Sequence, residues 1–179
     1  MLKLLFDRFF SLLILLSLFW LYILIGLIVL INLGFPIFYI AERVGKNNKV
    51  FKIFKFRTME HNSNNPKNSI MNFLRKSNLD ELPQFFNVVI GDMSVVGPRP
   101  HDLEEDKFFA ENIPNYKDRR IVKPGVTGLS AIMGNRGGND LEKIKERTIF
   151  DLEYIRKKSF SFDLYIIAKT ILTIFRPNH

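Results

Sequence analysis

The stretch FFSLLILLSLFWLYILIGLIVLINLGF, from Phe9 to Phe35, is almost wholly apolar. No Asp, Glu, Lys or Arg occurs anywhere from Phe9 to Ile40. The run exceeds the roughly 20 residues that cross a bilayer as a helix, whereas a secretory signal has a shorter apolar core followed by small residues. The sequence therefore predicts a retained N-terminal membrane helix over residues 1–41 and a second part over residues 42–179.

Both flanks of this run are basic. Lys3 and Arg8 precede it, and the positive-inside rule places the more basic flank of a simple span in the cytoplasm. A helix that enters and returns through one leaflet satisfies both basic flanks at once. Composition leaves the span and the re-entrant hairpin open. The cations of the second flank are Arg43, Lys46, Lys49, Lys52, Lys55 and Arg57.

The composition narrows the classes of function. The chain has 179 residues, of which 47% are hydrophobic, and its formal charge is +8, which suits lipid headgroups, phosphorylated substrates or nucleic acid. Because there is no cysteine, disulfides, thiol nucleophiles and thiolate metal sites are excluded. Three histidines without helical spacing make an imidazole zinc site improbable. The length fits one domain with an appended segment.

The residues after the apolar run predict an α/β, mainly helical fold in a single compact, membrane-associated domain. Lys49–Met59 alternates cations with apolar residues, which is typical of a strand or of a segment that grazes a membrane. Its position directly after the membrane run favours lipid headgroups over nucleic acid as its anion. Helices are expected at 70–75, from Asp80 to Ile90, at 101–112, at 141–157, and as an amphipathic helix at 164–175.

The stretch LDELPQFFNVVIGDMSVVGPRP, from Leu79 to Pro100, carries the strongest chemical signal. Proline is tolerated only in the first turn of a helix, so Pro83 places Asp80 and Glu81 at or beside the N-cap of a helix that Gly91 ends. A helix start binds phosphate, and carboxylates bind a metal ion that bridges to phosphate oxygens. Adjacent acids are also common as plain helix caps.

Arg99 favours the phosphate interpretation. It lies between Pro98 and Pro100, so its guanidinium, which suits two phosphate oxygens, has little conformational freedom. The loop GNRGGND, from Gly134 to Asp140, is neither a P-loop nor a dinucleotide fingerprint. Each further cation in or near a rigid stretch is a candidate phosphate ligand or an ordinary solvated charge: Arg75, Lys55, Arg57, Lys123 and Arg136.

Three motifs together resemble one family. ERVGKNNKVFKIFKFRTM, LDELPQFFNVVIGDMSVVGPRP and KPGVTGLSAI follow the apolar segment in this order, as in the bacterial sugar transferases, which are small monotopic phosphoglycosyl transferases. The resemblance covers nearly the whole chain. It implies transfer of a sugar 1-phosphate from a UDP-sugar to polyprenol phosphate, usually undecaprenyl phosphate, with Mg²⁺ and release of UMP. This reaction begins glycoconjugate assembly.

The resemblance also implies roles for individual residues. Asp80 matches the family's nucleophile, which forms a covalent phosphosugar intermediate, and Glu81 matches a metal ligand or acid–base partner. Both carboxylates are candidate Mg²⁺ ligands. Arg99 and Arg75 match phosphate-binding arginines. The expected partners are the two substrates and membrane lipid, without nucleic acid, and the expected location is the cytoplasmic face of the bacterial inner membrane.

Two features depart from the family pattern. Phe19-Trp20 stands where the family has the Ser-Pro pair that breaks its membrane helix into a re-entrant hairpin, although Ser17 or Gly26 would help a bend. The loop after Met59 is shorter than usual, so substrate contacts from it are not transferred. The alternative function is a catalytically silent, membrane-tethered protein that binds anionic lipid or nucleic acid through its basic face.

Overall fold

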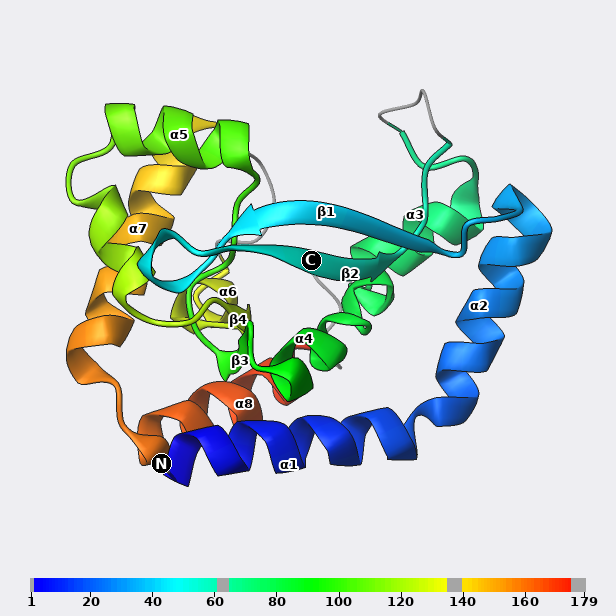
Figure 1. Ribbon diagram of the computed structural model, residues 1–179, viewed down its shortest axis with the longest axis horizontal. Helices are drawn as coiled ribbons and strands as arrows, with labels where there is room; N and C mark the ends of the chain where they lie inside the picture. Colours follow the sequence, from blue (N-terminus) through cyan, green and yellow to red (C-terminus); the bar gives the residue numbers. More distant parts are fainter. Residues whose placement is uncertain (1, 61–64, 135–139, 175–179) are drawn as a thin grey trace. The chain divides into compact units, whose positions relative to one another are not determined.

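The computed structural model describes residues 2–60, 65–134 and 140–174. These residues are mainly helical, with two small two-stranded sheets (Figure 1). They fall into two compact units, one built from Leu2–Ala41 and Lys52–Gly91 and the other from Glu42–Phe51 and Asp92 onward. The predicted boundary after residue 41 is thus a point where the chain passes between units. Its meaning as a divide between membrane anchor and cytoplasmic domain stays a prediction.

The elements follow in chain order. The helices of four or more residues and the strands are α1 (Leu2–Ser17), α2 (Phe19–Leu33), β1 (Phe38–Val44), β2 (Val50–Phe56), α3 (Ser69–Lys76), α4 (Gln84–Ile90), β3 (Ser94–Val96), α5 (Leu103–Asn112), β4 (Gly125–Thr127), α6 (Leu129–Ile132), α7 (Leu141–Lys157) and α8 (Phe160–Ile174). The 3₁₀ segments are η1 (Lys46–Asn48), η2 (Leu79–Glu81) and η3 (Tyr116–Ile121).

The apolar N-terminal run forms two helices rather than one. α1 and α2 are separated by Leu18 and bent by 64° relative to each other (Figure 1). Among the described residues no single helix has the length and apolar composition to cross a membrane, whereas this bent pair together meets both criteria, as a broken span or a re-entrant loop does. The bend therefore arises without a proline, directly before Phe19-Trp20. Ser17, the last residue of α1, donates to the carbonyl of Ile14.

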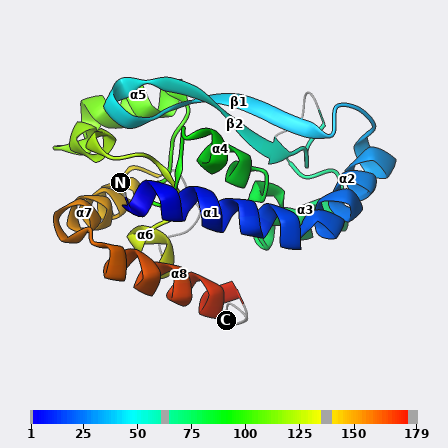
Figure 2. The ribbon, with the colours of Figure 1, turned by 60° about the horizontal axis from the view of Figure 1, so that its bottom comes forward.

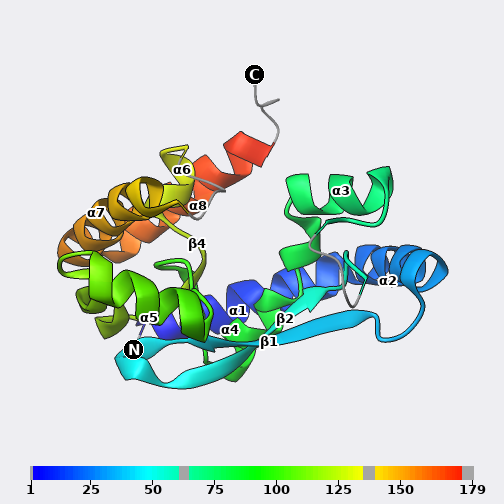
Figure 3. The same cartoon turned by 90° about the horizontal axis from the view of Figure 1, so that it is seen from above.

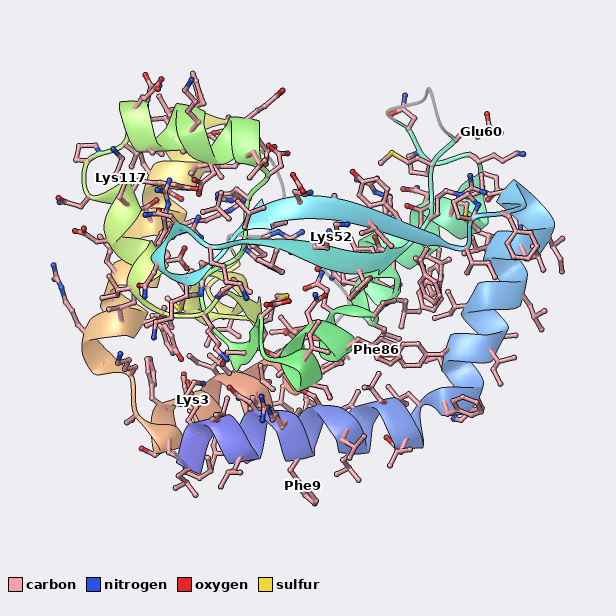
Figure 4. All side chains as sticks on the ribbon, in the orientation of Figure 1. Lys3, Phe9, Lys52, Glu60, Phe86 and Lys117 are labelled. Carbon is pink, nitrogen blue, oxygen red and sulfur yellow. The ribbon has the colours of Figure 1, made fainter. Side chains whose placement is uncertain are left out.

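The helix α1 shows an inverted burial pattern. It packs along α4 and buries its polar residues Asp7 and Ser11, while Leu5, Phe9 and Leu16 are exposed. Figure 4 shows the Phe9 side chain, which is 70% exposed, pointing outward from α1. A helix of a water-soluble domain normally does the opposite and hides its apolar stripe. The outer face of α1 is therefore suited to an apolar environment.

The core of the first unit joins α2 to the segment around Asp80. Ile25 and Val29 of α2 are buried with Phe56 of β2 and with Met71 and Leu74 of α3. Partly buried apolar side chains complete this core, among them Tyr22, Leu79 and Leu82. The two leucines flank Asp80 and Glu81 directly. Apolar packing therefore places the acidic pair against the N-terminal helix pair.

The second unit is organised around two parallel strands. β3 pairs with β4, with Ser94 opposite Gly125 and Val96 opposite Thr127. α6 lies against both α7 and α8 (Figure 2), and α8 also contacts the two strands. Figure 3 shows the same three helices grouped together. The Tyr154 hydroxyl of α7 donates to the carbonyl of Val96 and lies 2.7 Å from the Asp163 carboxylate of α8.

Most predicted elements are confirmed. Val50–Phe56 is a strand, and helices occupy Ser69–Lys76, Leu103–Asn112 and Leu141–Lys157. Asn68, Asp102 and Asp140 each cap the following helix by accepting the backbone N–H of its third residue. These three caps were not among the sequence predictions. Within the predicted amphipathic stretch, α8 buries Ile166 and Ile167 and exposes Leu164, Ile171 and Leu172.

Candidate active site

The predicted helix start at Asp80 is wrong in one respect. Asp80 and Glu81 lie in η2, a separate 3₁₀ turn, and α4 begins at Gln84 with Pro83 as its N-cap. Pro83 has no N–H to bond back to Leu79, so the α-helical ladder cannot run through it. The turn instead closes through the amide of Glu81, 3.1 Å from the carbonyl of Asn78, and the amide of Leu82, 3.4 Å from the carbonyl of Leu79. The predicted end of the helix at Gly91 is confirmed, with φ at 97°.

The acidic pair is nearly buried, and Glu81 forms an ion pair. Asp80 and Glu81 are each 9% exposed. The Glu81 carboxylate accepts a hydrogen bond from the Lys55 ammonium at 2.8 Å, and both side chains of this ion pair are largely shielded from solvent. Screening by water is weak at such a position, so Lys55 offsets much of the charge on Glu81. The structure thus brings Lys55, Asp80 and Glu81 into one cluster.

The other two candidate cations of this unit have local partners. Arg57 Nη2 donates to the carbonyls of Leu33 and Gly34, each at 2.6 Å, and so satisfies the C-terminal end of α2. Arg75 is exposed on α3, and its Nη1 donates to the Sδ of Met59 at 3.0 Å. A phosphate-binding role for either arginine stays a prediction. Arg57 has a clear structural role at the end of α2.

Two Pro-Gly turns of the second unit lie side by side. The amide of Gly125 donates to the carbonyl of Pro98, and the amide of Gly97 donates to the carbonyl of Thr127, both at 2.9 Å. A Cβ on Gly125 would lie 2.1 Å from the backbone nitrogen of Gly97, so only glycine fits at this crossing. The parallel strands thereby join the GPRP turn that carries Arg99 to the KPGVTG turn that carries Lys123. Arg136 lies outside the described residues.

A buried arginine holds the backbone of Arg99, and sequence reasoning missed it. Arg119, 5% exposed, donates to the carbonyl of Arg99 at 2.7 Å and to the Asp151 carboxylate at 2.6 and 3.1 Å. The Arg99 side chain itself is exposed. Arg119 sits in RRIVKPG, which reads as a solvated basic run, and its partner lies 32 residues further along. No local sequence pattern predicts the pairing of Arg119 with Asp151.

A histidine and a tyrosine complete the buried network. Arg119 Nη1 donates to His101 Nδ1 at 2.9 Å and to the Tyr116 hydroxyl at 3.0 Å. Since a guanidinium only donates, Nδ1 accepts, and the neutral ring carries its proton on Nε2. Burial, reinforced by Arg119 and other nearby arginines, lowers the pKa of His101 well below its usual value. His101 is therefore neutral at physiological pH and serves this network as an acceptor.

The carboxylates of Asp80 and Glu81 suit a Mg²⁺ ion that is also bound by substrate phosphates and water. Among the described residues, no group of three or more His, Asp or Glu side chains is placed to hold a metal ion. Mg²⁺ usually keeps several waters and binds one or two carboxylates together with substrate phosphates. Asp80 and Glu81, adjacent in η2, supply that number of carboxylates.

Comparison with known proteins places the chain in a family. The sequence profile of the bacterial sugar transferases matches residues 1–177. The UDP-glucose:undecaprenyl-phosphate glucose-1-phosphate transferase of Escherichia coli K12 is 43% identical over 148 residues, which cover 76% of this chain and 32% of that protein. The UDP-N-acetylgalactosamine-undecaprenyl-phosphate N-acetylgalactosaminephosphotransferase of Aeromonas hydrophila is 37% identical, and the match covers 78% of this chain and 35% of that protein.

A third relative matches in length as well. The exopolysaccharide production protein PSS of Rhizobium leguminosarum bv. phaseoli is 36% identical in a match that covers 96% of this chain and 94% of that protein. The chain thus spans about a third of the two longer relatives and nearly all of this one. On the match to residues 1–177, this chain belongs to the bacterial sugar transferase family.

Proposed function

We propose that this chain transfers a sugar 1-phosphate from a UDP-sugar to polyprenol phosphate, with undecaprenyl phosphate as the natural acceptor, and releases UMP. Family membership supports the reaction class, and the names of the Escherichia coli and Aeromonas relatives support the sugar nucleotide and the acceptor. The observation that carries the proposal is the nearly buried acidic pair in η2, in which Lys55 binds the Glu81 carboxylate at 2.8 Å.

The proposed reaction has two displacements. The Asp80 carboxylate attacks the β-phosphorus of the UDP-sugar, a new P–O bond forms an acyl phosphate, and the bond to the α-phosphate breaks so that UMP leaves. An oxygen of polyprenol phosphate then attacks the same phosphorus. This step forms the diphosphate-linked sugar lipid and returns the carboxylate to Asp80.

The chain's own residues stabilise these steps in distinct ways. Lys55 offsets the charge of Glu81, which lowers the repulsion between that carboxylate and the incoming diphosphate. Arg99 lies on a backbone that Arg119 and two prolines restrain, and its guanidinium is suited to phosphate oxygens. Bound Mg²⁺, held by Asp80 and Glu81, would neutralise charge on the diphosphate.

A direct assay tests the proposed function. Purified protein in detergent with a polyprenol phosphate and Mg²⁺ is screened against a panel of UDP-sugars for UMP release. We expect release from at least one UDP-sugar and loss of release when the lipid phosphate or Mg²⁺ is omitted. No release from any UDP-sugar, with intact binding to anionic vesicles, would instead identify a silent lipid-binding protein.

We further propose that the bent pair α1–α2 is a re-entrant hairpin in the inner membrane, with the remainder of the chain on the cytoplasmic face. The exposed apolar face of α1, the 64° bend at Leu18 and the two basic flanks support this arrangement. The exposed apolar side chains of α8 are suited to contact with the membrane surface. The anchor would hold the acidic pair near the depth of the lipid phosphate.

The topology proposal predicts the labelling of two introduced cysteines. The chain has no cysteine, so Lys3→Cys and Lys46→Cys each create a unique thiol on opposite flanks of the apolar run. With an impermeant maleimide on intact spheroplasts we expect neither thiol to react, and both to react after permeabilisation. Labelling of the Lys3→Cys variant alone in intact spheroplasts would establish a full span.

A further inference from the structure

Few polar side chains interrupt the apolar run, and two of them donate within their own helix. Its hydroxyl and amide side chains are those of Ser11, Ser17, Tyr22 and Asn32. Ser17 donates within its own helix, and Asn32 donates to the carbonyl of Ile28. Asn32 also accepts from Asn68, the N-cap of α3. Tyr22 differs from the others because its hydroxyl donates outside the helix pair to a backbone carbonyl 60 residues away.

That carbonyl belongs to the turn of the acidic pair. The Tyr22 hydroxyl donates to the carbonyl of Leu82 at 2.7 Å, and Leu82 follows Glu81 directly. The Tyr22 ring lies 5.9 Å from the ring of Phe56 and, edge-on, 5.9 Å from that of Phe86. Figure 4 shows Phe86 projecting from α4 toward α2. All of these residues belong to one compact unit, so their geometry is fixed by packing within it.

The turn has two closing bonds of its own, and the second is the weaker. The Glu81 amide donates to the Asn78 carbonyl at 3.1 Å, and the Leu82 amide donates to the Leu79 carbonyl at 3.4 Å. Leu79 and Leu82 pack on the core formed with α2, which resists sliding of the turn but not rotation of its peptide planes. The Leu82 carbonyl accepts two hydrogen bonds, from the Phe85 amide at 3.1 Å and from the Tyr22 hydroxyl at 2.7 Å. The shorter bond, from Tyr22, adds a restraint from α2 on that rotation, and with it on the direction in which the Asp80 and Glu81 side chains leave the backbone.

We infer that Tyr22 is a positioning residue of the active site: its hydroxyl, through the Leu82 carbonyl, holds the turn that carries Asp80 and Glu81 in its reactive orientation. The inference rests on the proposed function and deepens it. The N-terminal helix pair is then part of the catalytic machinery as well as an anchor, because a side chain of α2 orients the acidic pair.

Tyr22→Phe tests this inference without disturbing the packing. The variant keeps the ring against Phe56 and Phe86 and removes only the hydroxyl. We expect kcat for UMP release to fall about fivefold to tenfold, the range that one such hydrogen bond corresponds to, with KM for the UDP-sugar changed less than twofold and the variant still folded. Tyr39→Phe, at a half-exposed tyrosine of β1, is the matched control and should keep the wild-type kcat.

A second readout does not require activity. Hydrogen–deuterium exchange of the peptide that covers residues 79–86 should become about fivefold faster in Tyr22→Phe and stay unchanged in Tyr39→Phe. Unchanged exchange would overturn the tether, and faster exchange with wild-type kcat would overturn the positioning role. A rise in KM alone would also overturn it. If the wild type itself releases no UMP, the proposed function fails, while the exchange result still decides whether Tyr22 holds the turn.

Discussion

Asp80→Asn is expected to abolish both turnover and covalent labelling of the enzyme. In wild-type protein given a UDP-sugar with radioactive β-phosphate and no lipid acceptor, the label should remain on the protein after denaturation. The variant keeps the shape of the side chain but removes the nucleophilic carboxylate, and loss of one member of a cooperating catalytic set costs roughly three or more orders of magnitude in rate. UMP release and retained label are the two measurements.

Two further variants separate the role of Asp80 from that of a general negative charge. Glu81→Gln should lower turnover yet still allow the labelled enzyme to form, because Glu81 is paired with Lys55 and is not the attacking group. Asp92→Asn removes a carboxylate from an ion pair with Lys49 and should leave activity near wild type. Near-normal turnover in Asp80→Asn, or a wild-type enzyme that never retains label, would exclude Asp80 as the nucleophile.

Arg119→Met and Asp151→Leu should each destabilise the protein severely, and the double variant should be less unstable than the sum of the two. Arg119 and Asp151 are 5% and 2% exposed, and burial raises the pKa of Asp151 while Arg119 opposes that rise. Removing one partner leaves an uncompensated buried charge, which costs about 3–5 kcal/mol of the free energy of unfolding. Replacing both by apolar side chains removes that penalty. Denaturant unfolding of all four proteins measures the cycle.

An exposed ion pair provides the comparison. Lys157 and Glu153 lie 2.7 Å apart on α7, with side chains 64% and 39% exposed, and Lys157→Ala should change the free energy of unfolding by less than about 1 kcal/mol. If Arg119→Met behaves like Lys157→Ala, or if the two buried substitutions are additive, then the buried pair does not stabilise the fold as described. If neither single variant accumulates as folded protein while the double variant does, the result would support the prediction that one unpaired buried charge destabilises the fold.

The sequence by itself determined the features that depend on neighbouring residues. Hydropathy revealed the apolar run, the pattern of residues located α3, α5 and α7, and Gly91 marked the end of α4. The hydrogen bonds within a helix join residues a few positions apart, and the residues that begin or end the helix are its sequence neighbours. Such features can therefore be predicted from the local sequence. The three motifs likewise sufficed to recognise the family that the profile match confirmed.

Only the tertiary structure decided how the site is held. The sequence left a bend in the apolar run open, and the structure places it at Leu18. Three further features were absent from the sequence prediction: the 3₁₀ turn of Asp80 and Glu81, the pairing of Lys55 with Glu81, and the burial of Arg119 with Asp151. Each depends on residues far apart in the chain or on competing local conformations that differ little in energy. Long-range packing selects among these conformations. A buried charge without a partner, or a buried carbonyl without a hydrogen bond, costs free energy, so burial favours pairs of residues that no local sequence pattern connects.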